Sequence, residues 1–146
     1  MLRLRDPIHG FLHLDPLEAA LVGTRPVQRL RWIHQLGLTF LVYPGAEHSR
    51  FSHVLGASQL AGRVFDSLIE KRPGLVPEPE RPLARRLVRA AALLHDVGHA
   101  PFSHSAEDRF AGGIDHEAMT RRLLESDEIR TIFDRHGNGL ELAAVI

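Results

Sequence analysis

The chain has 146 residues, about the length of one domain, and its 44% hydrophobic and 25% charged residues are typical of a globular protein. Its 18 basic and 18 acidic residues balance, which argues against a protein that binds nucleic acid through bulk charge but leaves local contacts open. There is no cysteine, which excludes disulfides and thiolate metal sites, and no apolar run approaches the ~18 residues of a membrane span, so we expect a cytoplasmic protein without a membrane partner.

The N-terminal segment predicts a β-hairpin followed by a short helix. The sequence RDPIHGFLHLDP alternates apolar and polar residues around Gly10, as a short hairpin does. Asp15 and Pro16 then supply an N-cap and a first helical residue. Gly23 ends a helix that we expect to run to Val22.

The next segment repeats this pattern of helix start and helix end. We expect a helix over residues 24–36 that ends before Gly37, followed by a short strand or extended connection over 38–45. Ser49 can cap a long helix to about Glu70, because the apolar residues after it have helical spacing.

The second half of the chain predicts further helices separated by clear breaks. Four prolines and a glycine indicate a loop over residues 72–82. We expect helices from Pro82 to a bend or end at 98–101, and over 103–110, 115–125 and 127–135, with one more beginning at 140. Asp115 and Asp127 are interpreted as N-caps. The last helix has no ending residue, so we expect the chain to continue beyond Ile146.

Histidine is the unusual residue of this sequence, with ten copies, and the stretch ALLHDVGHAPFSH places three of them beside an aspartate. His95 and Asp96 are expected within the apolar helix that begins at Pro82, where an isolated buried imidazole would cost several kcal/mol. A divalent metal would supply the missing partner, and mixed imidazole and carboxylate ligands suit Zn, Fe, Mn, Co or Ni. His53, on the preceding long helix, offers a third ligand.

Two of these assignments have an ordinary structural alternative. His95 and Asp96 alone are also consistent with a hydrogen-bonded pair in the core. Arg50 lies three residues before His53, so both side chains lie on the same helix face. An arginine next to a metal site indicates a phosphate ligand, because the guanidinium matches phosphate oxygens. Taken alone, Arg50 is equally consistent with a surface residue.

Longer stretches carry a family resemblance. His53 followed by HDVGH resembles the H…HD…D signature of the HD-domain metal-dependent phosphohydrolases. From residue 5 to about 125, DPIHGFLHLDPLE, QRLRWIHQLG, VYPGAEHSRFSHVLGASQLAG, ALLHDVGHAPFSHSAEDRF and DHEAMT occur in the order found in the deoxynucleoside triphosphate triphosphohydrolases of the dGTPase type. The resemblance implies an all-α fold, an HD-domain helical bundle with a small N-terminal β-hairpin, over residues 1–146.

The resemblance also implies a role for each matching residue. One divalent metal (Mn, Fe, Zn, Mg, Co or Ni) would be held by His53, His95 and Asp96. The catalytic group would comprise His104 as general acid, Glu107 orienting it, and His99 and His116 around the phosphates. Substrate contacts would come from Arg50 at the triphosphate, Gln35 at the 3′ hydroxyl and Leu36 against the deoxyribose.

The implied activity is hydrolysis of a deoxynucleoside triphosphate to deoxynucleoside and tripolyphosphate. The family's fourth ligand, a later aspartate, has no match here, so we expect 1–146 to be the N-terminal part of a longer enzyme. Alternatives are an HD-type nucleotidase or phosphodiesterase, or a catalytically incomplete nucleotide-binding or assembly module. The resemblance further implies a homo-oligomer and, at Gln28 and Arg31, a nucleotide activator, although Gly23 replaces the aspartate of that site.

Overall fold

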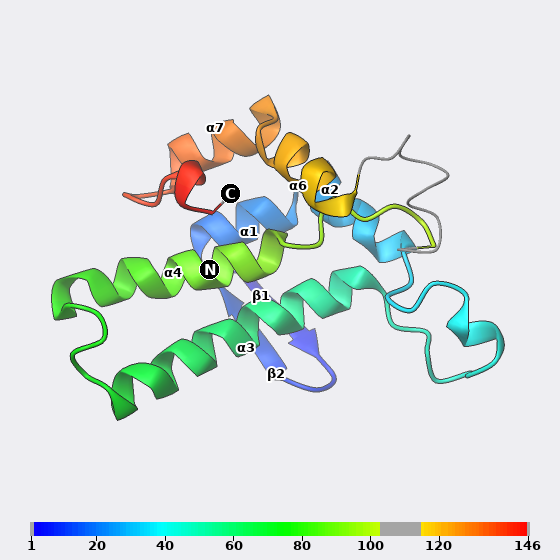
Figure 1. The fold of residues 1–146 in the computed structure, drawn as a ribbon, viewed down its shortest axis with the longest axis horizontal. Helices are drawn as coiled ribbons and strands as arrows, with labels where there is room; N and C mark the ends of the chain where they lie inside the picture. Colours follow the sequence, from blue (N-terminus) through cyan, green and yellow to red (C-terminus); the bar gives the residue numbers. More distant parts are fainter. Residues whose placement is uncertain (1, 103–114, 146) are drawn as a thin grey trace.

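The computed structural model describes residues 2–102 and 115–145. This part of the chain contains six α-helices and a single two-stranded sheet at its N-terminal end, as Figure 1 shows. The predicted helical fold with an N-terminal hairpin is therefore confirmed at this level. No helix in the described ranges has the length and apolar character needed to cross a membrane. The helix predicted over 103–110 lies outside the described residues.

The hairpin and first helix form as their local sequence predicts. Strands β1 (Leu2–Asp6) and β2 (Gly10–Leu14) are antiparallel, and Gly10 adopts the positive φ of 75° that the turn requires. Helix α1 (Pro16–Val22) begins with a capping box in which the Asp15 and Glu18 side chains accept from each other's backbone N–H, at 2.8 and 2.9 Å.

The helix predicted over residues 24–36 is shorter than expected. Helix α2 (Arg25–Gln28) continues as a 3-10 turn over Arg29–Trp32, and Ile33 is extended. The Ile33 carbonyl accepts from the Arg50 N–H at 2.8 Å, so the chain leaves the helix to pair with the segment before α3. The prediction for residues 38–45 is also wrong, because this segment contains a 3-10 turn, Thr39–Leu41.

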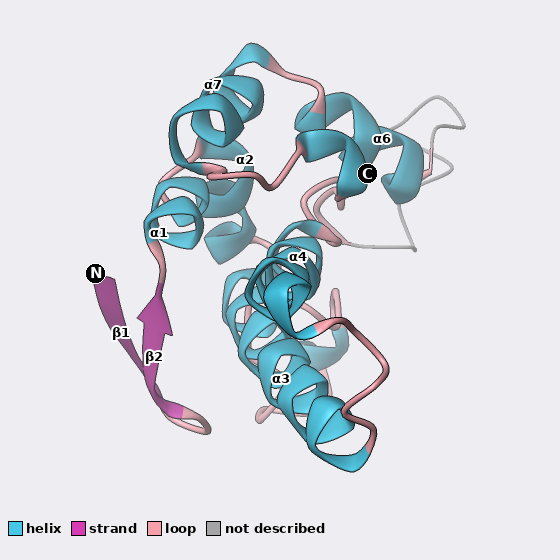
Figure 2. Ribbon diagram, turned by 90° about the vertical axis from the view of Figure 1, so that its left-hand side faces the viewer, coloured by secondary structure: helices cyan, strands magenta, loops and turns pink. Residues whose placement is uncertain are grey.

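The long helices α3 (Arg50–Lys71) and α4 (Arg81–Leu94) lie side by side and are joined at one end by the predicted loop (Figures 1 and 2). The Ser49 hydroxyl caps α3 by accepting from the Ser52 N–H, as predicted. Helix α4 ends at Leu94, earlier than expected. His95 and Asp96 therefore lie in the turn that follows the helix.

Helices α6 (His116–Leu124) and α7 (Asp127–His136) complete the described fold. The Asp115 carboxylate caps α6 through the Ala118 N–H at 2.7 Å, as predicted. Asp127 is the first residue of α7 rather than its N-cap, because Ser126 before it is the residue with extended backbone. The predicted C-terminal helix is a 3-10 turn over Leu142–Ala144.

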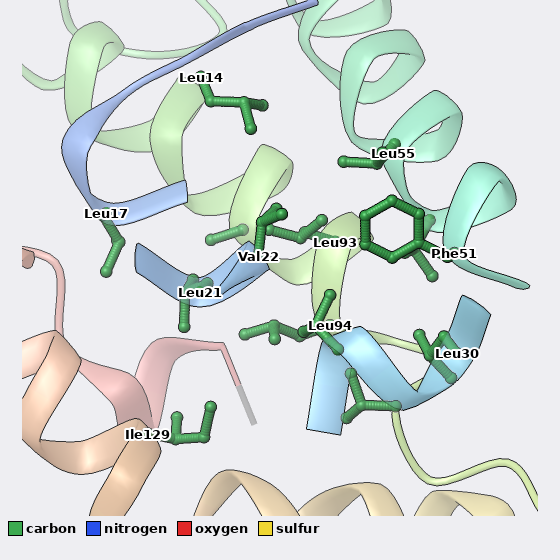
Figure 3. Packing of buried hydrophobic residues seen from close by; sticks show 14 of the residues in the cluster. Leu14, Leu17, Leu21, Val22, Leu30, Phe51, Leu55, Leu93, Leu94 and Ile129 are labelled. Atoms are coloured by element: carbon green, nitrogen blue, oxygen red, sulfur yellow. The ribbon is translucent and has the colours of Figure 1, made fainter. Parts of the chain in front are cut away.

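A hydrophobic core of described residues joins these elements (Figure 3). Leu21 from α1, Leu30 from the 3-10 turn, Val54 from α3, Leu93 from α4 and Ile129 from α7 are all fully buried. Because these residues pack against the start of α3 and the end of α4, the core holds in place the end of this helix pair where the histidines lie.

Candidate metal centre

His53, His95 and Asp96 come together into one cluster. Each offers one ligand atom, and these atoms all lie within 4.8 Å of one another. The His53 and His95 Nε2 atoms are 3.3 Å apart, and Asp96 Oδ1 is 3.2 Å from His95 Nε2. This arrangement of two imidazoles and one carboxylate can hold a divalent metal ion.

Local structure explains why residues 42 positions apart meet here. Ser49 fixes the first turn of α3, which carries Arg50 and His53. After α4 the chain turns through two backbone hydrogen bonds between residues three apart. The Val97 N–H donates to the Leu94 carbonyl and the His99 N–H to the Asp96 carbonyl, both at 3.2 Å. The start of one helix and the end of the other therefore supply the cluster.

The two histidines suit the role of metal ligand. His95 Nδ1 lies 2.8 Å from the Ala92 carbonyl, a contact in which Nδ1–H donates and which leaves the Nε2 lone pair directed at the cluster. Burial lowers the pKa of His53, the positive charges of His95 and Arg50 add to this, and only Asp96 opposes it. His53 is therefore neutral at pH 7, the state that binds a metal.

Asp96, rather than His95, is the buried member of the cluster. The sequence predicted a buried imidazole, but the His95 side chain is 44% exposed while that of Asp96 is 9% exposed. Burial by itself raises the pKa of the Asp96 carboxyl, but a hydrogen bond from His99 and the charges of His95 and Arg50 more than offset this. The pKa of Asp96 therefore lies well below its usual range.

Arg50 is part of this centre and not a surface residue. Its side chain is 4% exposed, and Nη1 donates to Asp96 Oδ2 at 2.5 Å. The surface alternative is therefore wrong. In this structure the guanidinium neutralises and orients the carboxylate; the contact with a phosphate stays a prediction.

His99 and His116 form a stacked pair next to the cluster. Their ring centroids are 4.0 Å apart with an interplanar angle of 10°. His99 is buried and its Nε2 lies 3.5 Å from Asp96 Oδ1, while His116 lines a cavity of about 390 Å³ together with His95 and Asp96. Burial lowers the pKa of His99, which favours the neutral imidazole.

Gln35 and Leu36 lie next to the segment that leads into α3. The Gln35 N–H donates to the His48 carbonyl at 3.0 Å, and His34 forms a β-bridge with Ser49. Gln35 Oε1 is buried with no hydrogen-bond partner among the described residues, and Leu36 is about half exposed. Both remain predicted substrate contacts. His104 and Glu107 lie outside the described residues.

A second cavity reaches His53 from the side of the hairpin. It measures about 510 Å³, and its lining includes His9, His48, Ser52 and His53. The His9 ring packs over Gly56, with Nε2 3.1 Å from where a Cβ would lie. His9 therefore packs the hairpin turn against α3.

Two residues that no sequence motif indicates hold the turn after α4. The Arg29 guanidinium donates to the Val97 carbonyl at 2.5 Å. The Thr120 hydroxyl contacts the His95 carbonyl and the Gly98 N–H. Neither residue belongs to a local pattern, so their roles depend on contacts that only the fold reveals.

Comparison with known proteins places these residues in a family context. The sequence profile of the HD domain matches residues 50–144. The uncharacterized protein YwfO of Bacillus subtilis is 47% identical over 124 residues, which cover 84% of this chain and 27% of that protein. The human deoxynucleoside triphosphate triphosphohydrolase SAMHD1 is 38% identical over 144 residues, covering 92% of this chain and 22% of that protein. The zebrafish protein of the same name is 46% identical over 142 residues, covering 90% and 22%. The chain thus spans about a quarter of the length of these relatives.

Proposed function

The chain belongs to the HD-domain family, and on that premise we propose that it forms the metal-binding part of a phosphohydrolase acting on deoxynucleoside triphosphates. The observation that carries the proposal is the cluster of His53, His95 and Asp96, whose ligand atoms lie within 4.8 Å. The substrate class is supported by the human and zebrafish relatives, which are named as deoxynucleoside triphosphate triphosphohydrolases. We further propose that residues 1–146 are one HD domain, and that a later carboxylate supplies a fourth ligand.

The described residues of this chain would have separate roles in metal binding and in contact with the phosphates. A bound divalent ion would supply charge stabilisation at a phosphate oxygen and a more acidic water. His99 and Arg50 keep the Asp96 carboxylate ionised, and the neutral His53 and the Nε2 atom of His95 complete the ligand set. His99 and His116 would lie beside the phosphates.

The remaining steps concern the substrate itself. Water attacks the α-phosphorus, the bond from that phosphorus to the 5′ oxygen breaks, and tripolyphosphate leaves intact. His104 would donate the proton that the departing 5′ oxygen needs, with Glu107 orienting its ring. Gln35 would bind the 3′ hydroxyl, and Leu36 would pack against the sugar. The buried, unpartnered Oε1 of Gln35 supports a ligand contact there.

The first experiment measures metal binding by calorimetry and elemental analysis, with Mn²⁺ as the probe. We expect one equivalent in the unaltered chain and a loss of affinity of about tenfold or more in His95→Ala, which removes an exposed ligand at little cost to the core. His48→Ala is the matched control, because His48 is exposed and close in sequence to His53 but outside the cluster. Less than a tenth of an equivalent in the unaltered chain would overturn the metal site.

The second experiment identifies the reaction. The chain is incubated with Mn²⁺ and dATP, dAMP or a cyclic dinucleotide, and the products are followed by phosphorus NMR. Tripolyphosphate from dATP supports the proposal. Stepwise orthophosphate or pyrophosphate, or turnover of dAMP or the cyclic dinucleotide in preference, favours the nucleotidase or phosphodiesterase alternative. Metal binding without turnover of any substrate favours a catalytically incomplete module.

We also propose self-association through the segment from Trp32 to Tyr43. Large apolar side chains are exposed along it: Trp32, Leu36, Leu38, Leu41, Val42 and Tyr43. Such a concentration of exposed apolar residues is typical of a protein interface. Sedimentation analysis tests it: the unaltered chain should sediment as an oligomer and Trp32→Ala with Val42→Ser as a smaller species. Equal masses would contradict the proposal.

A nucleotide activator at Gln28 and Arg31 is proposed on the resemblance alone. The Arg31 Nε donates to Gln28 Oε1 at 2.8 Å, and its guanidinium lies 3.6 Å from the centre of the Phe51 ring. GTP is the probe, because the resemblance implies a guanine contact at the aspartate that Gly23 replaces. Adding GTP in the sedimentation experiment should increase the oligomer fraction. The cytoplasmic location stays a prediction.

A further inference from the structure

The turn over residues 95–99 is held from the side by one hydroxyl group. Thr120 lies on α6, one turn after His116, and its Oγ1 accepts from the Gly98 N–H at 2.9 Å. The same Oγ1 donates to the His95 carbonyl at 3.3 Å. Asp96 lies between these two contacts, so Thr120 ties together both ends of the segment that carries the carboxylate.

This double contact requires the chemistry of a hydroxyl. Serine and threonine side chains can donate and accept at one atom, whereas valine has the shape of threonine but neither capacity. The turn's own backbone bonds use the N–H groups of Val97 and His99. The N–H of Gly98 is directed instead at Thr120.

The position of α6 leaves Thr120 little freedom. A Cβ at Gly98 would overlap the His116 carbonyl and the Thr120 N–H, so the two backbones are in direct contact at this point. On the same helix, the His116 ring stacks on His99. Helix α6 is therefore aligned with the turn by a backbone contact, a hydroxyl and a ring pair.

Thr120 also lines the 390 Å³ cavity with His95, Asp96 and His116. The Arg29 guanidinium donates to the Val97 carbonyl of the same turn. The turn that carries His95 and Asp96 is thus bound both by a residue that follows α2 and by α6.

We propose that Thr120 is a positioning residue for the metal centre: its hydroxyl fixes the backbone of residues 95–98 so that His95 and Asp96 meet His53. The inference rests on the proposed metal-binding function and deepens it. Thr120 itself binds neither metal nor substrate. Loss of its hydroxyl should weaken metal binding through the geometry of the turn.

The test compares Thr120→Val with Thr120→Ser, using calorimetry with Mn²⁺ and the thermal midpoint of the metal-free chain. Groups that orient metal ligands typically contribute about 10- to 100-fold in affinity, so Thr120→Val should weaken Mn²⁺ binding by that factor and Thr120→Ser should restore it. Thr24→Val is the matched control. It also removes a threonine hydroxyl bonded to a backbone carbonyl, that of Leu21 at 2.7 Å, but outside the site.

A merely structural role predicts a different result. Thr24→Val should lower the thermal midpoint and leave the affinity for Mn²⁺ unchanged, whereas Thr120→Val should change the affinity. The proposal is overturned if Thr120→Val binds Mn²⁺ as the unaltered chain does, or if Thr120→Ser weakens binding as much as Thr120→Val.

A second measurement separates this inference from the proposed function. Hydrogen exchange of the Gly98 amide, followed by NMR, reports the bond to Thr120 without metal. If the unaltered chain binds no Mn²⁺, the proposed metal site is wrong. The exchange rate of the Gly98 amide then tests separately whether Thr120 fixes the turn. Slow exchange in the unaltered chain and Thr120→Ser, with fast exchange in Thr120→Val, supports it; equal exchange in all three overturns it.

Discussion

The absence of a side chain at Gly98 allows α6 to pack directly against the turn that carries His95 and Asp96. Any Cβ at this position would overlap the backbone of α6 at His116 and Thr120. We predict that Gly98→Ala forces α6 away and destabilises the fold by about 1–3 kcal/mol, the usual cost of overpacking. Urea unfolding measures the change. The same displacement should separate the stacked rings of His99 and His116.

Gly74→Ala is the control for this prediction. Gly74 lies in the loop between α3 and α4, has no atom within 4 Å of an added Cβ and does not have a positive φ. Alanine there should leave stability unchanged or raise it by less than about 1 kcal/mol, because it restricts the unfolded chain. Equal urea midpoints for the two variants would show that α6 is not in direct contact with Gly98.

At the scale of elements, the sequence predicted those helix starts that depend on residues close together in the chain. The starts of α1 and α3 follow from Asp15 and Ser49, whose side chains cap the residues just after them. The helix expected over 24–36 is shorter because the Ile33 carbonyl accepts from the Arg50 N–H. Helical spacing of apolar residues cannot predict a hydrogen bond between such distant residues. The N-cap of α7 was predicted one residue too late, at Asp127 instead of Ser126, because serine and aspartate both favour that position.

A buried ion pair joins α1 to α4. Arg89 donates to both oxygens of Glu18, at 2.5 and 2.9 Å, and both side chains are less than a tenth exposed. Removing one partner leaves the other charged and buried, which costs about 3–5 kcal/mol. We predict this loss for Arg89→Met in urea unfolding. Glu18→Gln should lose less, because the amide oxygen can still accept from Arg89, and the guanidinium keeps its bonds to Gln59 Oε1 and the His13 carbonyl.

The double variant, Glu18→Gln with Arg89→Met, tests the cause. Because no buried charge remains, it should be more stable than Arg89→Met alone. A double-mutant cycle gives the coupling energy directly. Strictly additive losses would show that the two side chains do not stabilise each other.

An exposed ion pair links the far ends of α3 and α4. Arg85 donates to both oxygens of Asp66, at 2.7 and 2.8 Å, and this hydrogen bond lowers the pKa of Asp66 below 3.8. Because the folded-state pKa lies below the unfolded value, the pair stabilises the fold well above pH 3.8, and this contribution is lost as pH falls through the folded pKa.

Both side chains are more than a third exposed, so the effect is small. We predict that Asp66→Asn lowers stability by at most about 1 kcal/mol at pH 7, and that the difference from the unaltered chain shrinks toward pH 3. Asp134→Asn, at an exposed aspartate without an ion pair among the described residues, is the control. A difference that grows as the pH falls would contradict the prediction.

At the scale of the whole molecule, the sequence identified the ligand types but not how they are held. The motif named His53, His95 and Asp96, and the structure brings their ligand atoms within 4.8 Å of one another. It did not indicate that Asp96 is the buried member, because that follows from its contacts with Arg50 and His99. Nor did it indicate Thr120, which meets the turn only after α6 packs against Gly98.

The pair of α3 and α4 has two unequal ends. Val54 and Leu93 lie in the shared core, whereas the far end of the pair extends beyond the other helices, and Leu68 there is 45% exposed (Figure 2). Since local opening is easiest where few apolar groups are buried, amide exchange should be slowest at the core end and much faster near Lys71.

Metal binding should change this profile at one end only. His53 belongs to the start of α3 and His95 to the turn after α4, so a bound ion links the two helices at the core end. We predict that Mn²⁺ slows exchange around these residues and leaves residues 66–71 unchanged, because opening of the far end breaks no ligand contact. Exchange with mass-spectrometric detection, repeated on His95→Ala, measures this. Slower exchange over the whole helix pair would show that the two ends open as one unit.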